Sequence, residues 1–223
     1  MEPEGSWETV SSPKLSILVA TMGRRDEKFK RLIKNLKHQV SMYEGNIEIV
    51  AYWNNGELPI GDIRQALLEA ATGDYVCFVD DDDLVPTYYC GEIMAAILEK
   101  PDYIGFKVKV FSNTMDRPMA FHSLRYPGWF QDEHGYYRGV THLNPIRRDL
   151  ALLGTFSTTE RGGEDEAWAV SVRPHVKEEV FIDEIMYYYH HDTEDSAFGG
   201  TKEFGTHVFK PIKYKYLRYI CCT

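Results

Sequence analysis

The first hundred residues alternate between short apolar runs and longer amphipathic stretches, and this alternation limits the possible folds more than any other feature. Three apolar runs are predicted to form strands buried on both faces, at 15–20, 47–53 and 75–79. Apolar residues at three- and four-residue spacing predict helices after them, over 29–40, 63–71 and 87–99. Strands that alternate with helices form βαβ units, so we expect an α/β fold with a mostly parallel central sheet flanked by helices.

The second half of the chain is less regular. Residues 104–110 alternate between apolar and polar side chains, as in a half-buried strand. Residues 123–139 are rich in glycine, proline and aromatic side chains and are predicted to form a long loop or irregular segment. Two further helices are expected at 145–153 and 164–172, and a strand is expected at 180–189. Gly73, Pro101 and Gly154 are expected to end the helices before them.

Composition excludes several classes of protein. The chain has 223 residues with an apolar share of 43% and a charged share of 26%, which excludes collagen-like and disordered chains. Its four cysteines show neither a metal-binding spacing nor a secreted disulfide framework. No stretch approaches the roughly 20 apolar residues of a membrane span, and the polar start is unlike a signal peptide. A reducing cytoplasm is therefore the expected location.

Four consecutive aspartates, Asp80 to Asp83, follow the third predicted strand and carry the strongest chemical signal. In an open α/β sheet, ligands bind beyond the carboxyl ends of the strands. Carboxylates crowded there repel one another unless a cation or strong donors neutralise them, and oxygen ligands of this kind suit Mg²⁺ or Mn²⁺. The alternative is a solvated acidic turn, or Asp83 capping the helix that follows.

A second acidic stretch follows the two glycines at 162–163. Glu164, Asp165 and Glu166 would lie in the first turn of a helix, where the helix dipole favours negative charge. A carboxylate in that position is a candidate general base. The alternative is an ordinary acidic helix start, which the local pattern fits equally well.

Together these segments resemble a known family. The stretches SILVATMGRR and IGDIRQALLEAATGDYVCFVDDDD resemble the front half of a GT-A-fold glycosyltransferase of the large inverting family two. The stretch RGGEDE resembles the GGED segment of galactosyltransferase-type catalytic domains. The residues that fall on the family frame are Arg64, Ala71, Gly73, Asp74, Tyr75, Phe78, Asp80, Asp82 and Asp83. The resemblance covers about residues 15–191.

The resemblance implies a role for each matching residue. Asp165 would be the base that deprotonates an acceptor hydroxyl, and Glu164 would hold the acceptor. Asp80 and Asp82 would bind a divalent ion, Mn²⁺ or Mg²⁺. His190 or His191 would complete the shell of that ion, although a polar pair at a strand end is the simpler interpretation of two adjacent histidines. The reaction would transfer a sugar, with inversion, from a nucleoside-diphosphate sugar, of which a UDP-sugar is the expected donor.

The contacts to the donor come partly from this frame and partly from residues that depart from it. The first strand ends in Ala20-Thr21-Met22-Gly23-Arg24, where the family pattern is proline–threonine–x–asparagine–arginine. Asn54 stands where an aspartate commonly reads the base, and an amide can still hydrogen-bond a base edge. Trp129, in a glycine- and aromatic-rich loop, is a candidate for stacking on a sugar, with plain packing as the alternative. The expected donor-binding residues are Thr21, Arg24, Asn54, Arg64, Asp80, Asp81 and Trp129.

These predictions divide the chain into a tail at 1–13 and one domain over 14–223. Within the domain, residues 14–110 would bind the nucleotide sugar, and residues 111–195 would bind the acceptor and carry the catalytic groups. Residues 196–223 would be a mobile segment with a basic and aromatic tail.

Two other functions fit parts of the pattern: a nucleotidyltransferase with an acidic metal site, and a non-catalytic module that binds nucleotide sugars. The net charge of −9 would repel polyanions, but much of the acid lies at the proposed site. Basic residues gather over 24–37 and 210–218. A polyanionic acceptor, such as DNA with hydroxymethylated bases, therefore remains a candidate beside saccharides, lipid-linked acceptors and small molecules.

Overall fold

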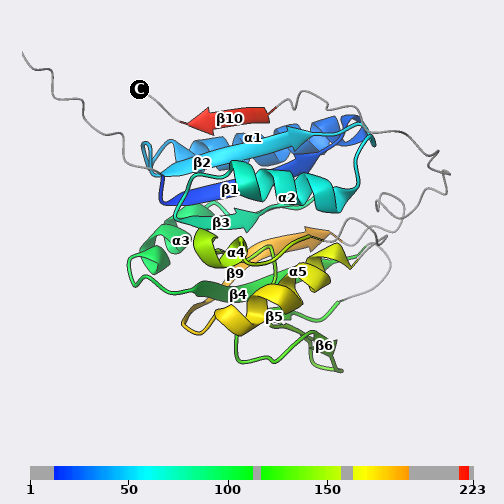
Figure 1. Cartoon of the computed structure of the whole chain (residues 1–223). Helices are drawn as coiled ribbons and strands as arrows, with labels where there is room; N and C mark the ends of the chain where they lie inside the picture. The colour runs from blue at the N-terminus through cyan, green and yellow to red at the C-terminus, as the bar shows by residue number, and fades with distance from the viewer. Residues whose placement is uncertain (1–12, 113–116, 157–162, 191–215, 221–223) are drawn as a thin grey trace, which may run out of the picture.

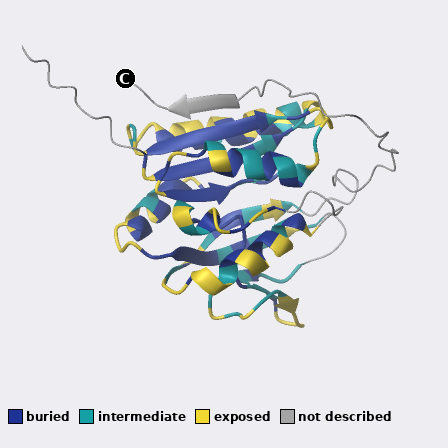
Figure 2. Ribbon diagram, in the orientation of Figure 1, coloured by how far each residue is buried: buried dark blue, intermediate teal, exposed yellow. Residues whose placement is uncertain are grey.

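The structure, a computed structural model, describes residues 13–112, 117–156 and 163–190 together with the backbone of 216–220. Three parallel strands form its front part, with β1 in the middle: β1 (Leu15–Thr21), β2 (Ile47–Trp53) and β3 (Tyr75–Phe78). All residues of these strands except Ala20 and Trp53 are buried, as expected for strands covered on both faces (Figure 2). The predicted α/β class is confirmed.

The other strands extend this front part into a ten-stranded mixed sheet (Figure 1). Strand β10 (Tyr216–Ile220) pairs antiparallel with β2 on one side. Beyond β3 the sheet continues in the order β8 (Ile146–Arg147), β4 (Tyr103–Phe111), β5 (Ala120–His122), β7 (Tyr136–Arg138) and β6 (Phe130–Gln131). Strand β9 (Glu179–His190) runs parallel to β4 and ends near the aspartates that follow β3.

Helices cover both faces because strand side chains alternate between them. Leu15, Ile17 and Val19 of β1 pack into one apolar core with α1 (Asp26–Val40) and α3 (Tyr89–Ile97). Leu18 points into a second core. Three helices contribute to that second core: α2 (Ile60–Ala70), α4 (Arg148–Ala151) and α5 (Glu164–Val172). The two remaining elements are single 3-10 turns, η1 (Gly23–Arg25) and η2 (Arg173–His175).

Gly73 does not end a helix, contrary to the prediction. Helix α2 ends at Ala70, and Ala71 is already extended. A Cβ atom on Gly73 would lie 2.7 Å from the backbone nitrogen of Ser16, and the Gly73 N–H donates to the Ser16 hydroxyl at 2.8 Å. The glycine therefore allows the chain to pass close against β1 before β3 begins.

Two predicted segments differ from the structure in the second half. The interval 123–139, expected to be irregular, contains β6 and β7, which continue the sheet. The helix expected over 145–153 is instead the short strand β8 followed by the one-turn helix α4, which ends three residues before Gly154. Helix α3 is also shorter than the predicted range 87–99. Elements of two to four residues are too short to leave a periodic pattern in the sequence.

Most of the two predicted terminal segments lies outside the described residues. Part of the predicted C-terminal tail forms β10, whose backbone pairs with β2. In the part of the chain that the structure describes, no helix is long and apolar enough to span a membrane.

A buried histidine in β5 makes the stability of the fold depend on pH. The His122 Nδ1 lies 2.7 Å from the Asn144 Oδ1, its ring stacks on Phe106, and burial lowers the pKa of His122 from 6.5 to about 4. As the pH falls from about 6.5 to 4, the His122 side chain therefore binds a proton in the unfolded chain but stays neutral in the folded chain. The stability contributed by neutral His122 is lost across that window, at up to about 1.4 kcal/mol per pH unit.

We expect His122→Gln to flatten this dependence. In urea unfolding at several pH values, the free energy of unfolding of the unaltered chain should fall more steeply below pH 6.5 than that of the variant. Parallel slopes for the two chains would show that His122 does not titrate in this way.

Candidate active site

The four aspartates lie at the carboxyl end of β3, beside the ends of the neighbouring parallel strands. They differ in accessibility: the side chains of Asp81 and Asp83 are 2% and 1% exposed, whereas those of Asp80 and Asp82 are 27% and 20% exposed. The stretch therefore offers two buried carboxylates that support the turn and two that a ligand can reach. The alternative that Asp83 caps α3 is excluded, because Tyr88 precedes that helix and Asp83 accepts a hydrogen bond from the His190 N–H.

Arg25 offsets part of this crowded charge, and the sequence did not single it out. It lies in η1, directly after β1, where Nη1 donates to the Asp81 Oδ1 at 2.8 Å and Nη2 lies 3.0 Å from the Asp82 Oδ2. Burial nevertheless raises the pKa of Asp82 to about 6, opposed by the Arg25 charge and assisted by Asp80 and Asp81. Burial also raises the pKa of Asp81 and, further, of Asp83. The site therefore holds more carboxylate than one arginine compensates.

Arg64 joins the two acidic stretches, which lie far apart in the sequence. Its guanidinium, on α2, is buried; Nη1 donates to the Glu164 Oε1 at 2.6 Å and Nη2 to the Asp80 Oδ1 at 3.2 Å. Burial raises the pKa of Glu164, and the Arg64 charge opposes that rise. The contact brings residues 100 positions apart into one site.

Asp165 lies beside this ion-pair network, in the first turn of α5. The helix begins after Gly163, whose φ of 84° favours glycine over any other residue. The Asp165 Oδ1 accepts a hydrogen bond from the Glu166 N–H at 2.9 Å, and Oδ2 lies 3.7 Å from the Nδ1 of buried His142. The Asp165 side chain is 27% exposed, so a substrate can reach it.

Three of the other expected donor-binding residues make contacts with other parts of the fold. The Asn54 Oδ1 accepts the N–H groups of Glu57 and Leu58, which closes the loop after β2. The Trp129 Nε1 donates to the Val140 carbonyl, and Arg138 lies over its ring. Arg24 is exposed, and its Nε points at the Met22 sulfur.

Thr21 does lie at the aspartates. Its side chain is buried at the end of β1, and its hydroxyl helps to lower the pKa of Asp81 against the larger effect of burial. The donor-binding roles of all these residues stay predictions.

The expected metal ligands are only partly assembled. His190 ends β9; its N–H donates to the Asp83 Oδ1 at 2.8 Å, and its ring stacks on Phe111. His191 lies outside the described residues. Among the residues that the structure describes, no group of three or more histidine, cysteine, aspartate or glutamate side chains is close enough to hold a metal ion. The exposed oxygens of Asp80 and Asp82 nevertheless suit Mg²⁺ or Mn²⁺ chemically, because such ions often take one or two carboxylates and complete their shell with phosphate oxygens and water.

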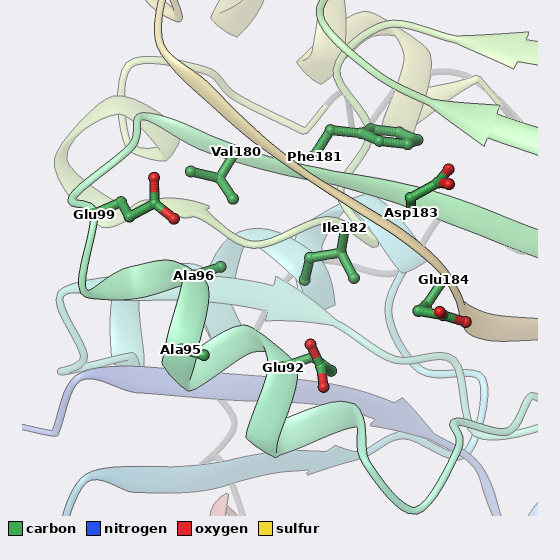
Figure 3. Close-up of a pocket in the computed structure, with 9 residues that line it drawn as sticks. All are labelled: Glu92, Ala95, Ala96, Glu99, Val180, Phe181, Ile182, Asp183 and Glu184. Atoms are coloured by element: carbon green, nitrogen blue, oxygen red, sulfur yellow. The ribbon is translucent and has the colours of Figure 1, made fainter.

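A separate hollow of about 370 Å³ lies between α3 and β9 (Figure 3). Glu92 on the helix, Glu99 in the turn after it, and Asp183 and Glu184 on the strand surround an apolar floor that includes Ile182. This hollow shares no residue with the carboxylate site, so we do not include it in the candidate active site.

Comparison with known proteins agrees with the fold. Residues 60–151, from the start of α2 to the end of α4, match the family model of glycosyl transferase family 2. This segment contains Arg64 and all four aspartates. No curated protein sequence matches the chain.

Solved structures of S. aureus TarS share the fold. TarS 1–349 matches with a TM-score of 0.57 and 18% identity, over 79% of this chain and 60% of that one. Its complex with UDP-GlcNAc matches with a TM-score of 0.56 and 18% identity, over 87% of this chain and 60% of that one. Its complex with UDP matches with a TM-score of 0.59 and 17% identity, over 82% of this chain and 62% of that one. This chain thus spans about 60% of the length of TarS 1–349.

The mixed sheet with helices on both faces and the matched segment are consistent with an α/β fold of the GT-A type. More particularly, its central segment, residues 60–151, is similar to glycosyl transferase family 2.

Proposed function

We propose that this chain transfers a sugar from a UDP-sugar to an acceptor hydroxyl, with inversion at the anomeric carbon. The observation that carries the proposal is the Arg64 bridge, which holds Asp80, from the acidic turn after β3, against Glu164, beside Asp165. A transferase needs an anion-compensating site for the leaving diphosphate and a base near the acceptor, and these two stretches are suited to those two tasks. That S. aureus TarS has been crystallised with UDP-GlcNAc and with UDP supports a uridine donor for a chain of this fold.

The donor side of the proposed site comprises Asp80 and Asp82, which would hold a divalent ion together with the diphosphate. A bound Mg²⁺ or Mn²⁺ would supply charge that stabilises the leaving diphosphate. Arg25 and Arg64 would keep the neighbouring carboxylates from repelling that diphosphate, because each already pairs with one or two of them. His190, which contacts Asp83, is the proposed histidine ligand.

The acceptor side comprises Asp165 as base and Glu164 as the residue that orients the acceptor. The acceptor oxygen would form its bond to the anomeric carbon as the bond from that carbon to the diphosphate oxygen breaks, and the hydroxyl proton would pass to the Asp165 carboxylate. A base on the face opposite the leaving group gives inversion, as in other inverting glycosyl chemistry. The 27% exposure of the Asp165 side chain supports this role, since a base must reach the proton that it removes.

A thermal-shift measurement tests the donor. UDP-GlcNAc with Mn²⁺ should raise the melting temperature, because a ligand at 100 times its Kd stabilises the folded state by about 2.7 kcal/mol. Mn²⁺ alone should have a smaller effect, and GDP-mannose serves as the matched nucleotide-sugar control. Equal shifts with both nucleotide sugars would contradict a uridine-specific site, and no shift with either would contradict a nucleotide-sugar site altogether.

A further inference from the structure

The wall behind the proposed base contains a buried polar side chain that the fold does not explain. His142 is 5% exposed and packs edge-on against Phe78 and Phe156, with ring centroids 5.6 Å and 6.5 Å away. Within the part of the chain that the structure describes, neither ring nitrogen makes a hydrogen bond. A buried polar group without a hydrogen bond costs about 1–3 kcal/mol, so its presence calls for an explanation.

The backbone fixes where this ring lies. The carbonyl oxygen of His142 accepts a hydrogen bond from the Phe78 N–H at 2.9 Å, which ties the residue to the last position of β3, two residues before Asp80. From there the ring faces α5, and its Nδ1 lies 3.7 Å from the Asp165 Oδ2. His142 is therefore held by the same strand end that presents the aspartates.

The two polar groups are complementary in chemistry. The other oxygen of Asp165, Oδ1, is already engaged by the Glu166 N–H, so Oδ2 is the one that faces the ring. Burial and the Arg64 charge hold the pKa of His142 well below its usual range, and Asp165 opposes this only in part. The imidazole is then neutral and carries one N–H, which donates to a carboxylate without cancelling its charge. A shift of less than 1 Å in the side chain of Asp165 would bring Nδ1 within the roughly 3 Å of a hydrogen bond.

We propose that His142 is a positioning residue for Asp165, whose Nδ1–H donates to the Asp165 Oδ2 and aims the carboxylate at the acceptor hydroxyl. The inference rests on the proposed function, because it assigns a partner to the proposed base. It goes beyond that function in naming a residue that acts through the base and does not touch the substrate.

Three variants separate this role from simple packing. His142→Leu fills the space but removes the donor, whereas His142→Asn keeps an N–H donor at the position of Nδ1. Phe156→Leu is the matched control, since Phe156 contacts the same ring and carries no polar group. The assay measures the UDP released when UDP-GlcNAc is hydrolysed in the presence of Mn²⁺, because water then replaces an identified acceptor. UDP binding to each purified variant is measured separately by thermal shift.

We expect His142→Leu to lower kcat for UDP release by about 10–100-fold, the usual effect of removing a group that orients a functional side chain. The KM for UDP-GlcNAc and the binding of UDP should change less than about twofold, because the donor site is intact. His142→Asn should recover most of kcat, and Phe156→Leu should keep it.

The possible failures are distinct. If the unaltered chain is active and His142→Leu keeps its kcat, or if His142→Asn and Phe156→Leu lose as much as His142→Leu, the positioning role is overturned while the proposed function stands. If the unaltered chain releases no UDP and does not bind it, the proposed function is overturned, and the positioning role with it.

Discussion

Asp82→Ala should lower the rate of Mn²⁺-dependent UDP release from UDP-GlcNAc by about 10²–10³-fold, the usual effect of removing one charge-stabilising group from a transition state. Asp82 is one of the two aspartates that a ligand can reach, and burial already raises its pKa to about 6, so it gains from a bound cation. The loss should appear in kcat and in Mn²⁺ affinity together, because the proposed ion stabilises charge that develops as the diphosphate leaves.

The control for this prediction is Asp149→Ala, which removes an exposed carboxylate of α4 that pairs with Arg147. It should keep the full rate. An Asp82→Ala variant that retained both its rate and its response to Mn²⁺ would show that Asp82 is not part of a metal site. Fluorescence or calorimetric titration with Mn²⁺ would measure the affinity directly in both variants.

Arg64→Leu is the substitution with the largest expected effect on stability. It removes a buried cation and leaves Glu164, 5% exposed, without its ion-pair partner. Breaking a buried pair in this way typically costs about 3–5 kcal/mol, because one charge stays buried and uncompensated. Urea unfolding of the variant should show a loss of this size, and UDP release should fall with it because Arg64 no longer holds Asp80 and Glu164 in one network.

A double variant distinguishes the loss of the Arg64–Glu164 ion pair from the loss of side-chain packing. In Arg64→Leu with Glu164→Leu, both charges are gone, so the loss of stability should be smaller than in Arg64→Leu alone. If the double variant is as unstable as the sum of the two single variants, the two side chains do not interact and the network is not the link between the acidic stretches.

Much of the fold could be predicted because its front part follows simple periodic rules. The apolar residues of α1 recur at three- and four-residue spacing, and Phe29, Leu32 and Leu36 all point into the core beneath it. The first two strands are continuous apolar runs because both of their faces are covered, and their predicted bounds agree with the structure to within a residue. By contrast, β8 and α4 are set by pairing and packing with β3, β4 and the second core rather than by a local pattern.

The candidate site could be predicted only where its acidic residues are consecutive in the sequence. Four aspartates after a strand and three acidic residues after two glycines are visible in the sequence. Arg25 was missed because its contacts depend on how the η1 turn folds back over Asp81 and Asp82. His142 was missed because it lies between β7 and β8 in a segment without periodicity, and only the fold brings it to Asp165.

The link between the two acidic stretches has a similar origin. Arg64 matched the family frame, but its pairing with Glu164 follows from how α2 and α5 share the second core, which no local pattern in the sequence specifies. The sequence therefore predicts the acidic parts of the candidate site, and the tertiary structure supplies their arrangement.

We expect this chain to cleave a UDP-sugar at the bond between the anomeric carbon and the diphosphate. The most direct measurement is to incubate the purified chain with UDP-GlcNAc and Mn²⁺ and to quantify UDP and free sugar by chromatography and proton NMR. We predict that UDP and sugar appear in equal amounts, that the sugar is first released as the inverted anomer, and that EDTA stops the reaction. No cleavage of any UDP-sugar, together with pyrophosphate release from a nucleoside triphosphate, would contradict the account and favour a nucleotidyltransferase.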